Sequence, residues 1–229
     1  MSLFAPSLNY LWKVISDFGI DPLPLFEQAG IDPALRLDVS ARVSARQMDE
    51  LVWHAKQLSH DEAFAFKLAA RVHPSYLGAL GYAWMTSATL RKAFERLSRH
   101  TAMVYDELRV PLEDHDDEFH VIIENNESGL HDPALRERGK MAIMVQLCRM
   151  VCGEQFNPTR ISFRHAMPGN APAYYEYFRC HLDFDTEVAK MVIPAALADA
   201  ELPGFNPQLV HTFDELIIEY LRQRDRSDI

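Results

Sequence analysis

Cysteine is scarce in this chain. Cys148, Cys152 and Cys180 are the only ones among 229 residues, and an odd number does not give the paired framework of a small disulfide-rich domain. The count fits a reducing compartment, where thiols stay free. Together with His181 these cysteines offer four possible zinc ligands, but structural zinc sites usually take their cysteines from short loops rather than an apolar helix. We therefore expect neither a bound metal nor a cofactor.

Long apolar runs and basic clusters are also missing. The first twenty residues lack a basic start and are interrupted by Asn9, Lys13 and Asp17. They therefore have the pattern of neither a secretory leader nor a membrane span. The formal net charge of −10 gives no general attraction to nucleic acid phosphates. These absences predict a cytoplasmic protein with no membrane partner.

Motifs of common enzyme classes are absent as well. The sequence contains no Gly-x-Ser-x-Gly, His-Glu-x-x-His, P-loop or Rossmann fingerprint. The stretch His115-Asp116-Asp117-Glu118 carries side chains that serve as metal ligands or acid–base groups elsewhere. It falls in an expected hairpin turn, where polar residues are the default, so we expect a solvated turn and not a site.

Apolar periodicity predicts a helix-rich chain with a few strands. The expected helices span 7–18, 22–29, 45–58, 62–72, 76–85, 89–103, 133–153, 172–179 and 208–226. The expected strands span 107–112, 118–124, 159–165, 182–184 and 188–193, with residues 113–117 as a hairpin turn. Because helices and strands do not alternate strictly, we expect an α+β fold: a helix-rich single domain around a small mixed or antiparallel sheet, followed by a C-terminal linker helix.

Two local signals are more specific. Ser44 to Gln47 has the capping-box pattern, which predicts a helix beginning after Ser44. Gly78 and Gly81 are three residues apart, so on a helix they share a face and permit another backbone to approach closely.

The glycine-rich segment also carries a resemblance to a known family. Leu77-Gly78-Ala79-Leu80-Gly81-Tyr82 is followed by Thr86-Ser87 and by Leu90-Arg91-Lys92-Ala93-Phe94-Glu95-Arg96-Leu97. Further along come Gly153-Glu154, the strand Arg160–His165, the aromatic element Pro172–Cys180 and Leu202-Pro203-Gly204. In order and spacing the chain resembles, over most of 5–207, the arabinose-binding-like N-terminal domain of AraC-type transcription regulators. His181 departs from the pattern, because proline is common there.

The resemblance implies a ligand sensor and not an enzyme. It implies that residues 1–205 form the ligand-sensing domain and that 206–229 form a linker or dimerisation helix. Family members reach DNA through a C-terminal helix-turn-helix domain, which is absent from this chain. The apolar stripe of the last helix either packs on its own domain or joins two copies into a homodimer. It contains Leu209, Phe213, Leu216, Ile217 and Tyr220.

A small-molecule effector is expected between the sheet and the helices, in a mostly apolar pocket with a few polar groups. Arg164 suits a carboxylate, and tyrosine and tryptophan offer apolar area with one polar atom. The candidate ligand-binding residues are Tyr82, Trp84, His100, Tyr105, Arg164 and His165. The alternatives are that Tyr82 and Trp84 belong to the core and that Arg164 forms an ion pair. Two other functions also stay open: an enzyme using Arg164, His165 and Tyr105, and a structural interaction domain without a ligand.

Overall fold

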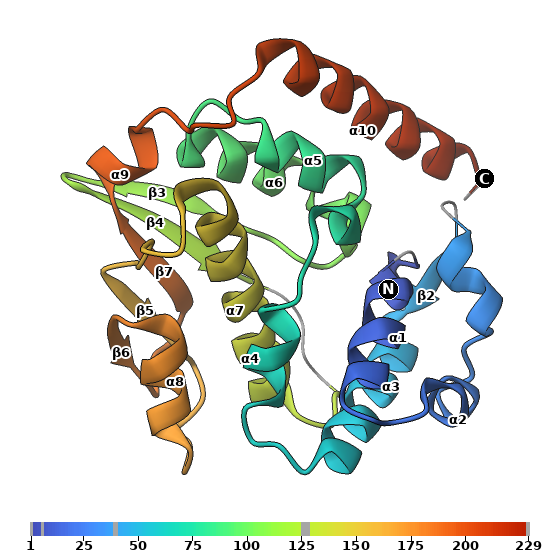
Figure 1. Cartoon of the computed structure of the whole chain (residues 1–229). Coiled ribbons are helices and arrows are strands. Elements are labelled where there is room, and N and C mark those ends of the chain that lie inside the picture. The colour runs from blue at the N-terminus through green and yellow to red at the C-terminus, as the bar shows by residue number, and fades with distance from the viewer. Residues whose placement is uncertain (1, 6, 39–40, 125–128, 228–229) are drawn as a thin grey trace.

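The computed structural model describes residues 2–5, 7–38, 41–124 and 129–227. Figure 1 shows three parts: a block of N-terminal helices, a sheet with helices on one face, and a long C-terminal helix across one end. The described chain is an α+β domain, as the sequence predicts. Within these residues no helix is long and apolar enough to cross a membrane.

Five strands form the main sheet, in the order β3-β4-β7-β5-β6. All neighbours are antiparallel except β5 and β6, which are parallel. Because strand side chains alternate, Phe119, Val121 and Ile123 of β4 enter the core while His120 and Ile122 face the other way. The strands span Leu112–His115 (β3), Glu118–Ile123 (β4), Arg160–Ser162 (β5), His181–Asp183 (β6) and Ala189–Pro194 (β7).

The β3–β4 hairpin differs from the sequence prediction. Residues 113–115, expected in the turn, continue strand β3, and the turn contains only Asp116 and Asp117. Asp116 adopts a positive φ of 47°, which allows so tight a turn. Residues 107–111, expected as the strand, contribute only one isolated bridge, between Arg109 and Glu124. An edge strand tolerates the polar sequence of β3 because one of its sides faces water.

The N-terminal block contains a two-stranded sheet that the sequence prediction lacks. Strand β1 (Ser2–Phe4) pairs antiparallel with β2 (Arg42–Ser44), and strands of three residues are too short for a periodic signal. The helices of this block are α1 (Ser7–Asp17), α2 (Pro22–Gln28) and α3 (Ala45–Ser59). The predicted capping box at Ser44 and Gln47 is confirmed, with both of its hydrogen bonds present.

The segment with the paired glycines is less regular than predicted. Instead of one helix over 76–85, a 3₁₀ turn at Pro74–Leu77 is separated from α5 (Ala79–Met85) by Gly78, whose φ is +59°. The close approach at Gly81 is confirmed: a Cβ atom there would lie 1.9 Å from the carbonyl oxygen of Pro74. This tight contact fixes α5 against the turn that precedes it.

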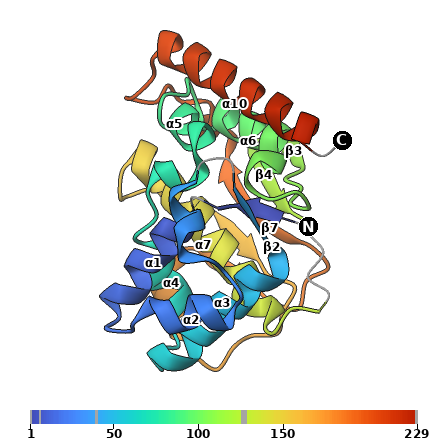
Figure 2. The ribbon, with the colours of Figure 1, turned by 90° about the vertical axis from the view of Figure 1, so that its right-hand side faces the viewer.

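The remaining helices cover the sheet. Helix α7 (Pro133–Cys152) passes through the centre of the molecule, between the sheet and the N-terminal block (Figures 1 and 2). Its neighbours include α4 (Phe64–Ala69) and α8 (Ala171–Phe178). Helix α6 (Leu90–Val104) begins at the Thr89 cap and packs Phe94 against Phe119 of the sheet, and α9 (Ala195–Asp199) follows β7.

Helix α10 (Pro207–Ser227) lies across α5 and α6 (Figures 1 and 2). Phe213 stacks on Tyr82 with ring centroids 5.5 Å apart, Ile217 is fully buried, and Asp214 pairs with Arg96 at 2.6 Å. Leu209 and Leu216, from the same predicted stripe, stay exposed. Three of the five stripe residues, Phe213, Ile217 and Tyr220, therefore pack on their own domain, and the other two face outward.

Candidate functional site

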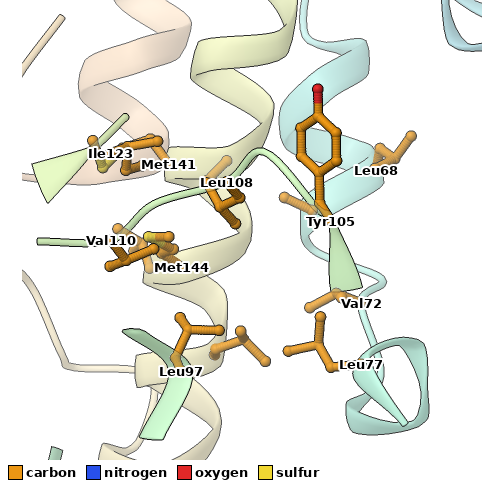
Figure 3. Packing of buried hydrophobic residues seen from close by; sticks show 14 of the residues in the cluster. Leu68, Val72, Leu77, Leu97, Tyr105, Leu108, Val110, Ile123, Met141 and Met144 are labelled. Carbon is orange, nitrogen blue, oxygen red and sulfur yellow. The ribbon is translucent and has the colours of Figure 1, made fainter. Parts of the chain in front are cut away.

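A cavity of about 110 Å³ lies where the N-terminal block meets α7. Its wall is almost entirely apolar and is built from segments far apart in the sequence. It is lined by Leu3, Leu11, Met48, Val52, Phe64, Ala65, Leu68, Tyr76, Tyr105, Leu108, Leu135, Arg136, Gly139, Lys140 and Ile143. Figure 3 shows part of this wall, with Tyr105 between Leu68 of α4 and Leu108. An apolar hollow with a few polar groups is the usual form of a small-molecule site.

Helix α7 provides one whole side of the cavity. Its lining residues, at 135, 136, 139, 140 and 143, are spaced three and four apart and so share one face. Gly139 leaves the middle of this face open, because a Cβ atom there would meet nothing within 4 Å. A glycine inside a helix costs roughly 1 kcal/mol relative to alanine. At this position it leaves space in front of the helix.

Two cations on α7 give the cavity its electrostatic character. Arg136 and Lys140 lie one turn apart, and no acidic side chain lines the cavity in the described part of the chain. The Nε of Arg136 is buried and, among the described residues, has no hydrogen-bond partner. The Nζ of Lys140 lies 6.0 Å from the centroid of the Tyr105 ring. A buried guanidinium donor without an acceptor is costly, so this position favours an anion.

Tyr76 adds a second donor beside Arg136. Burial raises the pKa of Tyr76, and the nearby Arg136 charge opposes this only in part. The hydroxyl therefore keeps its proton at neutral pH and can donate a hydrogen bond. The Tyr76 ring also packs against that of Tyr10 at 5.1 Å, and the Tyr10 hydroxyl donates to the carbonyl of Leu68. These contacts fix the aromatic side of the cavity.

Of the six residues expected to bind ligand, Tyr105 is the one that lines this cavity. Trp84 is buried in the core, where its indole N–H donates to the carbonyl of Leu147 at 3.0 Å. Tyr82 is 40% exposed and stacks on Phe213 of α10. His100 sits at a kink in α6, where burial and then Arg99 lower its pKa from 6.5. The ligand-binding role of all these side chains stays a prediction.

Arg164 and His165 lie elsewhere. Arg164 Nε donates to buried Glu137 at 2.5 Å, and the residue borders a hollow of about 360 Å³ beside the end of β4 and the start of β7. His165 packs among aromatic rings, with Nδ1 2.8 Å from the Ala166 carbonyl. The three residues of the enzyme alternative therefore do not meet in one site. Tyr105 and Arg164 line different hollows, and His165 lines neither of the two.

Sequence reasoning missed the cationic pair on α7. Arg136 and Lys140 precede the almost wholly apolar stretch 141–152, which drew attention to the core instead. The signal was present in the spacing: two cations four residues apart, with Gly139 between them, on a helix whose other residues in the same face are apolar. Spacing alone, however, does not tell which helix face is solvated.

The cysteines do not form a zinc site among the described residues. Cys148, Cys152 and Cys180 are free thiols, and no group of three ligand side chains that includes a cysteine comes together there. Burial raises the pKa of Cys152 to about 11 and that of Cys180 to about 12. Metal coordination needs thiolates, and these environments favour the protonated form.

A match to a protein-family model shows which family the chain belongs to. Residues 19–202, well over half of the sequence, match the model of the N-terminal arabinose-binding domain of AraC transcription regulators. The chain belongs to this family. It is therefore the effector-binding type of regulatory domain, in agreement with the resemblance read from residues 77–97 and 153–204.

The chain is also similar to two known regulators. The chain is 25% identical over 208 residues to an ornithine utilization regulator of Pseudomonas aeruginosa, a match that covers 90% of this chain and 60% of that protein. It thus spans less than two thirds of the length of that relative. The crystal structure of the transcriptional regulator CdpR from Pseudomonas aeruginosa has a TM-score of 0.64 at 17% identity, covering 94% of this chain and 68% of that one. At this identity the likeness shows the fold alone.

Proposed function

We propose that this domain binds its effector in the cavity beside α7, and that the effector is a small molecule with an apolar body and one anionic group. The buried Nε of Arg136, which has no hydrogen-bond partner among the described residues, carries the proposal. In a cavity walled by apolar side chains, an anion at this donor satisfies both its charge and its hydrogen bond. Tyr76, Tyr105 and Lys140 surround the same space.

The size of the cavity limits the first ligands to test. At about 110 Å³ it is smaller than the cavities of roughly 150 Å³ that hold benzene. Monocarboxylates of four to six carbons have about six to eight non-hydrogen atoms, close to the six of benzene, so they are the first ligands to test. A longer ligand requires the N-terminal helices to move away from α7.

The charge of the wall argues for a monocarboxylate rather than a diamino acid. One of the two relatives is named for ornithine utilization, and ornithine has a carboxylate that would suit Arg136. Its two ammonium groups, however, would lie close to the Arg136 guanidinium, with no acidic residue in the described lining. Like charges in a low-dielectric site repel strongly, so this lining disfavours a cationic amino acid.

A continuous set of contacts joins the cavity to α10. Leu3 and Tyr105, which both line the cavity, form a bridge between β1 and the segment after α6. Their neighbours Ser2 and Asp106 are held by Arg42, whose Nη2 donates to Asp106 at 3.0 Å.

The same arginine reaches α10. Arg42 Nη1 donates to the Tyr220 hydroxyl at 3.2 Å, and Arg224 of α10 donates to the Ala102 carbonyl at 2.7 Å. The end of α10 is therefore attached to the residues next to the cavity wall. We propose that the effector shifts the population between two positions of this helix.

The wider architecture follows the same proposal. Residues 1–205 sense the effector and 206–229 transmit its binding to a DNA-binding domain outside this chain, in a cytoplasmic, non-catalytic regulator. The exposed face of α10, with Leu209, Leu216 and Ile218, is the surface proposed for homodimerisation. A two-fold dimer would suit repeated half-sites on DNA. Sedimentation of a purely monomeric species at high concentration would contradict the dimer.

Calorimetric titration with butanoate, pentanoate and hexanoate tests the effector site. We expect binding to the wild-type protein, at least roughly tenfold weaker binding to Arg136→Met because the charge-assisted contact is lost, and none to Gly139→Leu because leucine fills the open space. Arg164→Ala is the matched control, because Arg164 borders the other hollow. Binding that survives in Arg136→Met and disappears in Arg164→Ala would place the effector in the hollow beside β7 and refute the proposal.

A further inference from the structure

We infer that the outer face of the β3–β4 hairpin is a binding site for a divalent transition metal ion such as Zn²⁺. The site consists of Glu113 and His115 on β3 with Glu118 and His120 on β4. It lies apart from the cavity beside α7 and does not depend on the effector proposal.

The register of the hairpin brings these four side chains together. Glu113 is the antiparallel partner of His120, and His115 is the partner of Glu118. Directly opposed residues point to the same face, and residues two apart on a strand share it. The four positions thus form a square with histidine and glutamate at alternating corners. It exists because residues 113–115 continue the strand instead of forming the turn that the sequence suggested.

The ligand atoms are already close to coordination distance. His115 Nε2 lies 3.0 Å from Glu113 Oε2, and His120 Nε2 lies 2.8 Å from Glu118 Oε2. The two imidazole rings are 4.4 Å apart, and one ligand atom each from Glu113, His115 and His120 lie within 4.8 Å of one another. A tetrahedral zinc ion with bonds of about 2.0–2.1 Å separates its ligands by about 3.3 Å. Small side-chain rotations therefore suffice.

The chemistry of the donors selects the metal. Two imidazole nitrogens and one or two carboxylate oxygens suit Zn²⁺, and Ni²⁺ to a lesser extent, whereas Mg²⁺ and Ca²⁺ prefer oxygen ligands alone. His120 is largely buried and so is held in place, while the other three side chains are half exposed and leave the site accessible. A bound ion would link β3 to β4 through side chains and replace the two histidine–glutamate hydrogen bonds.

The same sheet face contains a natural control. His181 Nε2 lies 2.9 Å from Asp183 Oδ1 on β6, again a histidine and a carboxylate two residues apart. The strand partner of His181 is Arg160, so no second histidine–carboxylate pair lies opposite this one. This single pair offers two ligands where the hairpin offers four, so it should not hold zinc by itself.

Equilibrium dialysis of the chelator-treated, untagged chain against zinc chloride, followed by elemental analysis, tests the site. We expect about one zinc ion per chain, at least roughly tenfold weaker binding in His115→Ala and in His120→Gln, and unchanged binding in His181→Ala. His115 is exposed, so its variant keeps the fold even if His120→Gln does not.

Three results would overturn the assignment. One is a wild-type protein that binds no more zinc than His115→Ala. Another is equal weakening in His181→Ala, which would indicate general surface binding. The third is zinc binding that is abolished by alkylating the cysteines and is insensitive to His115→Ala, since this would move the metal to the thiols.

Discussion

Two arginines on α7 should respond to the same substitution with opposite changes in stability. Arg136 faces the cavity with its Nε buried and without a partner among the described residues. Arg149, three turns further on, is 5% exposed and donates from Nε to the Phe156 carbonyl at 3.3 Å and from Nη2 to that of Tyr177 at 2.7 Å. Methionine has a similar length, no donors, and the flexibility to fill an irregular space.

The magnitudes follow from what each guanidinium contacts. An unsatisfied buried polar group costs about 1–3 kcal/mol, so Arg136→Met should raise the free energy of unfolding by about 1 kcal/mol. Arg149→Met removes two charge-assisted hydrogen bonds and leaves the buried Phe156 carbonyl and the partly buried Tyr177 carbonyl without these donors, for an expected loss of about 3 kcal/mol. For a chain of this length 1 kcal/mol corresponds to a Tm change of roughly 2–4 °C.

Urea unfolding followed by circular dichroism, without ligand, measures both changes. The reasoning predicts a higher midpoint for Arg136→Met and a lower one for Arg149→Met, with similar slopes. A loss of more than about 1 kcal/mol in Arg136→Met would show that Arg136 stabilises the empty fold. It would then be a structural arginine, and the argument for an anionic effector would fail. A stabilised variant that no longer binds the effector is typical of a functional site.

Two further predictions concern α10 and acid stability. Arg42→Met should increase amide hydrogen exchange in residues 216–224, because Arg42 joins Tyr220 to the segment beside the cavity. Effector affinity should stay the same, because Arg42 does not line the cavity. Unchanged exchange would rule out this connection. His100 has a pKa lowered from 6.5 by burial and Arg99, with Asp214 of α10 opposing. The His100 imidazole is therefore protonated at a higher pH in the unfolded chain than in the folded protein. The free energy of unfolding falls as the pH falls from about 6.5 to the lower pKa of the folded state. His100→Gln should lose less stability than wild type between about pH 7.5 and about pH 5.5, and equal losses would show that His100 does not titrate this way.

Much of the fold could be predicted from local sequence. Helices with strong caps and long apolar periodicity, such as α3 after Ser44 and α7 after Asp132, begin where the sequence places them. The prediction was wrong where tertiary contacts decide. Strands β1 and β2 have three residues each, and β3 forms because Asp116 permits a two-residue turn and β4 offers an edge. Neither effect produces a periodic pattern.

The candidate site was less predictable than the fold. Of the side chains predicted to bind ligand, Tyr105 does line the cavity. Arg164 was chosen because arginine suits carboxylates, but it already has the buried carboxylate of Glu137 as its partner. Arg136, whose Nε has no hydrogen-bond partner in the described part of the chain, resembles any other arginine in sequence. The presence of an ion-pair partner depends on long-range packing, which a single sequence does not display.

The central claim is that an anionic group of the effector binds at Arg136 in the cavity beside α7. Its most direct test is a calorimetric comparison of pentanoate, pentanol and pentylamine on the wild-type protein and on Arg136→Met. The three ligands share one apolar body and differ in charge. We predict that wild type prefers the carboxylate to the alcohol and the alcohol to the amine, and that the preference for the carboxylate disappears in Arg136→Met. Equal affinity for all three in wild type, or a preference for the amine, would contradict the account.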